Sequence, residues 1–109
     1  MNTVQLIGRL CNDVQTRKLP TGSITTDFRI AVNRRKHDET DFITVVAWGK
    51  TAELIERYCR KGDRVAIMGR LQTRSYTNKD GVKVNAVEVV ADEIDFLEKR
   101  KDTADDLPL

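Results

Sequence analysis

Residues 41–50, DFITVVAWGK, alternate with a period of two, and this alternation constrains the fold more than any other feature of the chain. Successive side chains of a β-strand point to opposite faces, so the stretch has an aliphatic face and an aromatic face. The aliphatic face, which we expect to lie against a core, holds Ile43, Val45 and Ala47. The opposite face holds Phe42 and Trp48, in a chain with one Trp, two Tyr and three Phe. A core on the aliphatic side does not explain these two rings.

Four other stretches alternate in the same way and predict further strands. They are residues 3–10, 24–33, 64–76 and 82–98. The turn between the last two contains Asp80 and Gly81, a pair that readily adopts the backbone angles of a tight hairpin. The side chains that we expect to point inward are Phe28, Ile30, Val32, Val65, Ile67, Leu71, Val87, Val89 and Ala91.

Between residues 50 and 61 the period changes to that of a helix. The apolar positions at helical spacing are Thr51, Leu54, Ile55, Tyr58 and Cys59. Basic residues gather near the end of this segment, and Gly62 is placed to terminate a helix. We expect Tyr58, as part of the apolar stripe, to lie in the core.

The predicted order of elements is three strands, a short helix and two strands. That order predicts an all-β fold, a five-stranded barrel of the oligonucleotide-binding (OB) type with its helix between the third and fourth strands. A different small barrel stays open at this point, because strand count determines neither strand order nor closure. With 109 residues, one domain is expected, over residues 1–97, followed by a flexible acidic tail over residues 98–109.

The net charge of +2 hides an asymmetry between the body of the chain and its end. Residues 1–91 hold 16 Lys and Arg against 10 Asp and Glu, whereas residues 92–109 hold 3 against 7. A basic body favours a polyanionic partner.

Neither a cofactor nor a metal ion is predicted, and an enzyme is disfavoured. His37 is the only histidine and lies in a polar stretch, RRKHDETD, without the partners that a metal site needs. Cys11 and Cys59 are predicted to be free thiols. No apolar run is long enough to cross a membrane and no secretory signal is evident, so we expect a cytoplasmic protein with no membrane partner.

Three outward rings, each with polar or basic neighbours, predict a surface that binds single-stranded nucleic acid. Phe42 and Trp48 share one strand face, and Tyr76 ends an outward row that also contains Arg70 and Arg74. Flat rings stack on any base while Lys and Arg hold the phosphates, so such a surface binds with little regard to sequence. Taken singly, an outward ring can equally fill a subunit interface.

The chain resembles the bacterial and phage single-stranded DNA-binding proteins over residues 2–96 and again at its tip. The resemblance is carried by VQLIGRLCNDVQTRKLPTG, FRIAVNRR, VVAWGKTAELIERYCRKGDRVAIMGRLQTRSYTNKDG and the terminal DDLPL. It implies that Phe42, Trp48 and Tyr76 occupy base-stacking positions. It also implies a homotetramer built as a dimer of dimers, with DNA wrapped around the outside and residues 3–10 at the dimer interface.

Within that picture we predict a set of phosphate contacts along the strands and loops. The candidates are Arg9, Arg29, Arg34, Arg35, Lys36, Arg70, Arg74 and Lys79. Some members of the family carry a further aromatic residue in the loop after the second strand, where this chain has NRRK. Charge then replaces stacking in that loop, which predicts a stronger dependence of binding on salt.

The tip of the chain departs from the family pattern. Members typically end in a long linker, acidic residues, a hydrophobic residue, proline and phenylalanine, which replication and repair proteins capture. Here the linker is short, and the last residues are Asp105, Asp106, Leu107, Pro108 and Leu109. Capture would pair the acidic groups with a basic pocket and place the leucines in an apolar one. The alternative is an acidic end that only aids solubility or competes weakly with DNA.

The sequence therefore predicts a protein that coats and protects exposed single strands during DNA replication, recombination and repair. The first alternative is a dimeric OB-fold adaptor of replication restart, in which contacts with nucleic acid are secondary. The second is a small nuclease, which the absence of clustered acidic metal ligands in the sequence disfavours.

Overall fold

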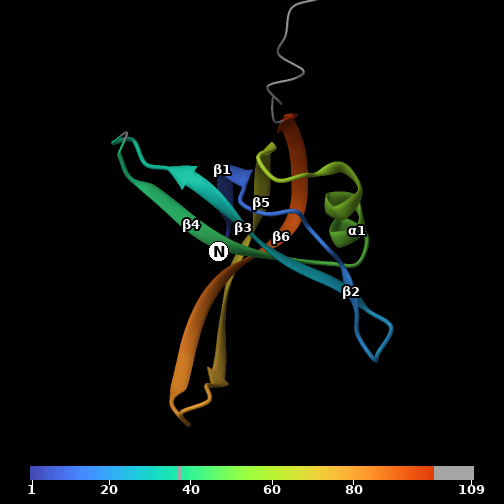
Figure 1. Cartoon of the computed structure of the whole chain (residues 1–109), viewed down its shortest axis with the longest axis vertical. Helices are drawn as coiled ribbons and strands as arrows, with labels where there is room; N and C mark the ends of the chain where they lie inside the picture. The colour runs from blue at the N-terminus through green and yellow to red at the C-terminus, as the bar shows by residue number, and fades with distance from the viewer. Residues whose placement is uncertain (37, 100–109) are drawn as a thin grey trace, which may run out of the picture.

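The computed structural model describes residues 1–36 and 38–99. It contains one helix, α1 (Gly49–Tyr58), which lies between the fourth and fifth strands (Figure 1). The strands are β1 (Val4–Leu10), β2 (Arg17–Lys18), β3 (Ile24–Asn33), β4 (Thr40–Trp48), β5 (Arg64–Thr77) and β6 (Lys83–Glu98). The five long strands and the position of the helix confirm the predicted order of elements.

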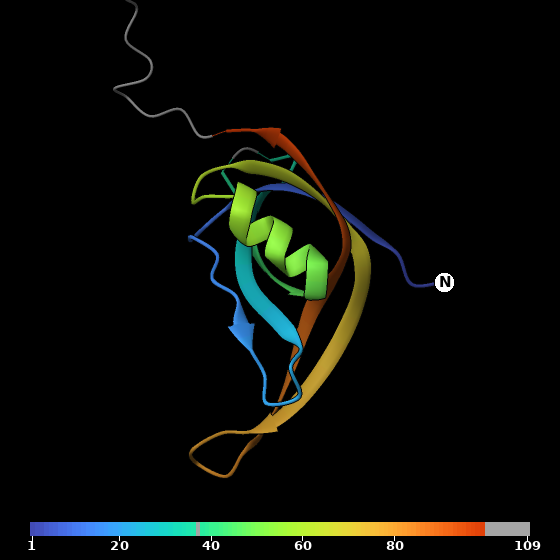
Figure 2. The same cartoon turned by 90° about the vertical axis from the view of Figure 1, so that its right-hand side faces the viewer.

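The five long strands close into a ring. Their order in the sheet is β1-β5-β6-β4-β3, and β1 pairs with β3 to complete the circle. The pairing of β4 with β6 is parallel, with Val45 opposite Val89, and the other pairings are antiparallel. Helix α1 contacts β3, β4 and β6 and lies across the ring (Figure 2). Closure confirms a barrel and leaves the ring itself without an unpaired edge.

The core fills the inside of this ring with the side chains that alternation predicted to point inward. Val45, Ala47, Ile30 and Ile67 are fully buried. Val32 and Ile43 are partly buried and pack against the same cluster. The other inward predictions that are buried are Phe28, Val65, Val89 and Ala91.

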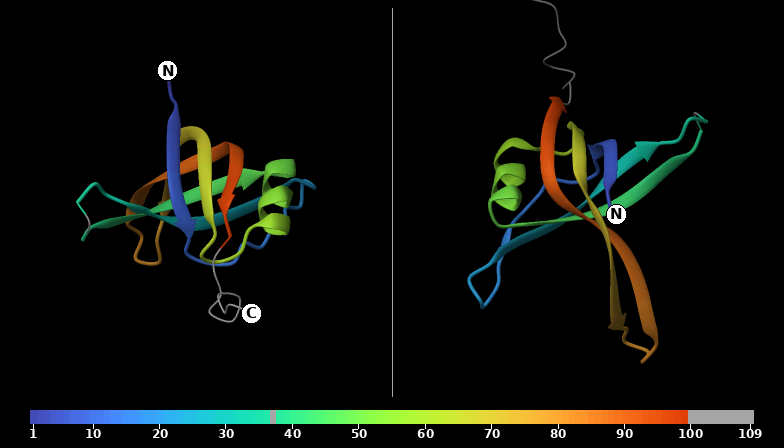
Figure 3. Two further views of the ribbon diagram at one scale, coloured as in Figure 1. Left: turned by 90° about the horizontal axis from the view of Figure 1, so that it is seen from above. Right: turned by 180° about the vertical axis from the view of Figure 1, so that it is seen from behind.

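Two inward predictions are wrong. Leu71 is 48% exposed and Val87 is 62% exposed. Both lie where β5 and β6 leave the ring as a long hairpin, which Figure 1 and the rear view in Figure 3 show projecting away from the barrel. Side chains of the two strands still alternate there. Within the hairpin, however, no third element covers the face that points into the core within the barrel. Alternation shows which side chains share a face of a strand, but it does not show how far along the strand that face is buried.

Close approach of backbones explains two glycines at turns of the ring. A Cβ on Gly8 would lie 2.6 Å from the carbonyl oxygen of Ala31, at the point where β1 passes from β5 onto β3. A Cβ on Gly69 would lie 1.9 Å from the carbonyl oxygen of Val90, beside a register shift between β5 and β6. Only a residue without a side chain fits at either position.

The helix differs from its prediction in two respects. It ends at Tyr58, and Gly62, with a positive φ of 91°, lies four residues later in the turn before β5. Ala52, Ile55 and Cys59 form the buried face, whereas Tyr58 is 45% exposed, so its expected place in the core is wrong. The Tyr58 ring instead lies against Phe96 on the surface, with 5.6 Å between ring centres.

The two-residue strand β2 was not predicted. Arg17 pairs with Thr25 and Lys18 with Ile24, so β2 adds a short edge to β3. Two residues are too few to show alternation, and no local signal in the sequence marks them.

Candidate nucleic-acid interface

The three predicted rings lie on the surface. Phe42 is 57% exposed, Trp48 is 47% exposed and Tyr76 is 48% exposed. Phe42 and Trp48 come from β4, whose opposite face supplies Val45 and Ala47 to the core, and Tyr76 comes from the projecting hairpin. Exposed rings of this size lose contact with water only when a ligand or partner covers them.

Two of these rings have a guanidinium group beside them. The guanidinium carbon of Arg29 on β3 lies 5.4 Å from the centre of the Phe42 ring, and that of Arg74 lies 5.7 Å from the centre of the Tyr76 ring. Contacts of this kind within about 6 Å are attractive. They hold a positive charge next to a flat surface, which is the combination that a nucleotide requires.

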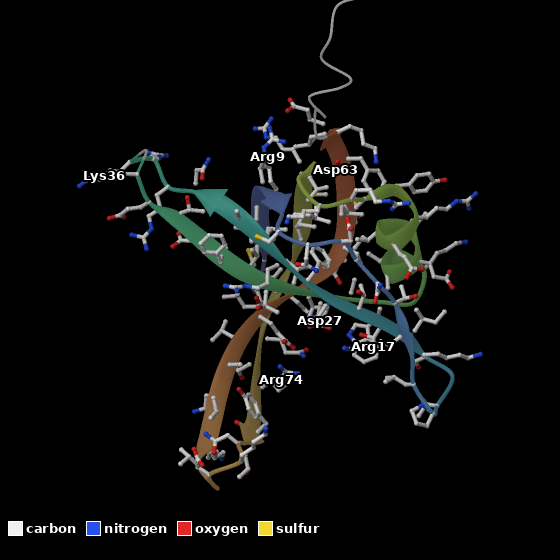
Figure 4. The ribbon with its side chains drawn as sticks, viewed as in Figure 1. Arg9, Arg17, Asp27, Lys36, Asp63 and Arg74 are labelled. Atoms are coloured by element: carbon white, nitrogen blue, oxygen red, sulfur yellow. The ribbon has the colours of Figure 1, made fainter. Side chains whose placement is uncertain are left out.

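Trp48 of β4 lines a cavity of about 400 Å³ to which five strands contribute. Its polar and charged lining includes Arg17 of β2, Asp27 of β3, Gln72 and Arg74 of β5, and Glu88 of β6. Arg17 and Asp27 form an ion pair of 3.0 Å, and Arg74 lies 4.0 Å from Glu88. Figure 4 shows Arg17, Asp27 and Arg74 in this part of the molecule.

Sequence reasoning missed three charged members of this cavity. Arg17 lies on β2, which shows no pattern, and Asp27 and Glu88 carry the charge opposite to that expected for a nucleic-acid surface. Glu88 is only 5% exposed although it points to the outward side of β6. No signal in the sequence predicted its burial, because it depends on the neighbours of β6 in the sheet, β5 on one side and β4 on the other.

The loop between β3 and β4 holds three of the predicted phosphate contacts. Arg34 forms ion pairs with Glu39 at 2.5 Å and with Asp41 at 2.9 Å. The hydrogen bonds from Arg34 lower the pKa of the Asp41 carboxyl, so this pair stays ionised. Arg35 and Lys36 are exposed, with Lys36 near the tip of the loop in Figure 4.

The remaining predicted cations lie apart from the Trp48 cavity. Arg9 donates hydrogen bonds to Glu98 at 2.8 Å and to the carbonyl oxygen of Gly62 at 3.0 Å, near the end of the barrel opposite the projecting hairpin (Figure 4). Arg70 forms an ion pair of 2.7 Å with Asp92, and Lys79 is exposed in the turn of the β5–β6 hairpin. The structure thus places Arg29 and Arg74, but not these three, beside predicted rings.

Several sequence predictions fall outside the described residues or concern other kinds of site. The tail residues Asp105, Asp106, Leu107, Pro108 and Leu109 lie outside the described range, as does His37. Within residues 1–36 and 38–99, no three His, Cys, Asp or Glu side chains come together in a group that could hold a metal ion. The single helix of that part is too short to cross a membrane.

A closed five-stranded barrel, with its helix between the third and fourth long strands and with exposed rings beside cations, defines a protein of the OB-fold class. The chain belongs to the single-strand binding protein family, whose profile matches residues 1–97.

Proteins of several bacteria are similar to this chain over most of its length. It is 50% identical over 103 residues to "Single-stranded DNA-binding protein" of Clostridium tetani, and the aligned region covers 90% of this chain and 71% of that protein. It is 46% identical over 108 residues to "Single-stranded DNA-binding protein 2" of Clostridium acetobutylicum, covering 94% and 81%. It is 45% identical over 109 residues to "Single-stranded DNA-binding protein 1" of Streptococcus pyogenes, covering 95% and 84%.

Proposed function

We propose that this protein binds single-stranded DNA with little regard to sequence, by stacking bases on Phe42, Trp48 and Tyr76. The observation that carries the proposal is that all three rings are about half exposed, two of them with a guanidinium within 6 Å. The names of the similar bacterial proteins support the same ligand. In duplex DNA the faces of the bases are stacked on one another, so they are not available to stack on the three rings.

Phosphate contacts come from the cations around the rings. Arg29 and Arg74 have the best position for this role, because each lies next to a ring that would hold a base. The further proposed contacts are Arg9, Arg34, Arg35, Lys36, Arg70 and Lys79. Several of them form ion pairs with carboxylates, which a phosphate must displace.

In the cell the protein coats exposed single strands during replication, recombination and repair and protects them, as a non-enzymatic protein of the cytoplasm. The assembly that we propose is a homotetramer, with β1 at the dimer interface. Residues 1–97 form the DNA-binding domain, and residues 98–109 form an acidic tail that recruits replication or repair proteins through Asp105, Asp106, Leu107, Pro108 and Leu109. The dimeric adaptor is not favoured, because it gives the three exposed rings no role.

The test is a titration with an unstructured single-stranded oligonucleotide, followed by the fluorescence of Trp48, which is the only Trp. Stacking predicts quenching and a lower affinity at higher salt. The same titration with duplex DNA is the control and should show weak binding. Equal affinity for the duplex, or a dimeric mass by analytical ultracentrifugation together with unquenched Trp48, would instead support the adaptor.

A further inference from the structure

The base of the β5–β6 hairpin is the pair of Leu71 and Val89, beyond which the hairpin leaves the ring. Val89 of β6 also pairs with Val45 of β4, so β6 is attached to the ring at this point. In the described part of the chain, residues 72–77 of β5 pair with β6 and with no other strand. The direction of the hairpin therefore depends on what holds its two strands at the base.

A side chain, and not a strand, holds β5 at this base. The backbone pairing of β1 with β5 ends where Val4 lies opposite Gly69, and the same register would place residue 2 opposite Leu71. The side-chain amide of Asn2 donates a hydrogen bond to the carbonyl oxygen of Leu71 and accepts one from its N–H, both at 2.9 Å. An asparagine side chain has the same donor and acceptor groups as a peptide unit. Asn2 thus continues the β1–β5 pairing by one step with its side chain.

These two hydrogen bonds come directly after a bend in the sheet. The β5–β6 pairing has a register shift between Met68 and Gly69, two residues before Leu71. An irregularity of this kind bends a strand and increases its twist. Asn2 therefore attaches β5 to the ring on the far side of the bend, where the orientation of the hairpin is decided.

The hairpin carries one of the two pairs of ring and guanidinium in the proposed DNA-binding surface. Arg74 and Tyr76 lie on β5 beyond Leu71, with 5.7 Å between the guanidinium carbon and the ring centre. Tyr76 is five residues along the strand from Leu71, and at about 3.4 Å per residue this distance is roughly 17 Å. Over that length, a tilt of about 10° at the base moves the ring by roughly 3 Å. The place of Tyr76 relative to Phe42 and Trp48 on β4 thus depends on the base.

We propose that Asn2 is a positioning residue for single-stranded DNA, because its side-chain amide holds the hairpin in the orientation in which Arg74 and Tyr76 bind. This inference rests on the proposed function and adds to it a residue outside the proposed surface. Asn2 is exposed, so its contribution is to orientation and not to the core. Without its two hydrogen bonds the hairpin adopts further orientations, and the apparent affinity falls with the fraction of molecules in the competent one.

The test measures the affinity for an unstructured single-stranded oligonucleotide in Asn2→Ala and Thr3→Ala. The net contribution of hydrogen bonds at an exposed position is modest, so we expect Asn2→Ala to weaken binding about threefold. Thr3→Ala is the control, because Thr3 is the neighbouring residue and is equally classed as exposed. It should bind as tightly as the parent. Equal affinities of Asn2→Ala and the parent would overturn the proposal.

Two matched backgrounds separate an effect on the hairpin from a general effect on stability or assembly. The first, Arg74→Gln with Tyr76→Ala, lacks the hairpin contacts. The second, Arg29→Gln with Phe42→Ala, lacks the corresponding pair on β3 and β4. Asn2→Ala should have no further effect in the first background and its full effect of about threefold in the second. An equal loss in both would show that Asn2 acts through stability or assembly, and would overturn the proposal.

Exchange of the Leu71 amide hydrogen gives a second measurement that does not involve DNA. The hydrogen bond from this N–H to Asn2 predicts slow exchange in the parent and faster exchange in Asn2→Ala. Equal exchange in the two proteins would show that Asn2 does not hold the hairpin, and would overturn the proposal. Failure of the parent to bind the oligonucleotide would instead overturn the proposed function itself, whatever the exchange of Leu71 shows.

Discussion

The guanidinium of Arg29 and the ring of Phe42 lie 5.4 Å apart on the outward face of neighbouring strands, β3 and β4. The inward faces of the same two strands supply Ile30 and Val45 to the core, so the core holds this surface in place. A base stacked on the ring would carry its phosphate close to the cation. Arg74 and Tyr76 repeat the arrangement within one strand.

Removal of a ring should weaken binding of single-stranded DNA without unfolding the protein. Trp48→Ala and Phe42→Ala should each cost about 1 to 3 kcal/mol of binding free energy, the value of one stacked base. Tyr58→Ala is the matched control, because Tyr58 is equally exposed but lies on α1 against Phe96. Anisotropy of a labelled oligonucleotide gives the affinities. A loss for Tyr58→Ala as large as that for Trp48→Ala would contradict stacking at the predicted positions.

Loss of a cation beside a ring should change the salt dependence of binding. Arg29→Gln and Arg74→Gln should each reduce the slope of log K against log salt by about 0.7, the share of one phosphate on a single strand. Arg57→Gln is the control, because the Arg57 guanidinium lies 5.5 Å from the centre of the Tyr58 ring, outside the proposed surface. Unchanged slopes in both test variants would show that the two arginines do not contact phosphates.

Arg9 should contribute less to binding than Arg29, although the sequence predicted both as phosphate contacts. Arg9 is held by Glu98 and by the carbonyl oxygen of Gly62, and a phosphate would have to replace these partners. We expect Arg9→Gln to reduce the salt slope by less than Arg29→Gln, measured in the same titrations. Its effect on the free energy of unfolding should stay below about 1 kcal/mol, since this ion pair is exposed. A slope reduced as far as in Arg29→Gln would show that DNA reaches this end of the barrel.

A side chain at position 69 should destabilise the barrel. The Cβ of Gly69→Ala would overlap the carbonyl oxygen of Val90, so β6 has to shift at its register change. We expect a loss of about 3 kcal/mol in the free energy of unfolding, measured by urea denaturation. Thr73→Ala, at an exposed position of the same strand, should stay within about 0.5 kcal/mol of the parent. Equal stability of the two variants would mean that the strands separate at position 69 at little cost.

Stability should fall at alkaline pH because of Cys59. Burial, and next the charge of Asp63, raises the pKa of this thiol from 9.0 to about 11. The unfolded chain therefore loses the proton at a lower pH than the folded one, and stability declines as pH rises from about 9 to about 11. Cys59→Ala lacks this titration, so the difference in free energy of unfolding between parent and variant should change with pH across that window. A constant difference would contradict the raised pKa.

The sequence predicted the barrel and much of its surface because alternation is a local property. Phe42 and Trp48 could be placed outside, and Val45 and Ala47 inside, from their spacing alone. The same reasoning was wrong at Leu71 and Val87, where the alternation continues into the hairpin beyond the closed ring of strands. It was also wrong at Tyr58, whose ring lies against Phe96 at the surface while Ile55 of the same helix is buried.

What the sequence by itself determined is the face on which each side chain of a strand lies, since a period of two is built into the extended backbone. Only the tertiary structure decided which of these faces are buried, because the residues that bury a strand face come from distant parts of the chain. The Trp48 cavity shows this most clearly, because Arg17, Asp27, Arg74 and Glu88 come from four strands and meet only when the ring closes. The burial of Glu88 and the projection of the β5–β6 hairpin depend on that closure and on no local pattern.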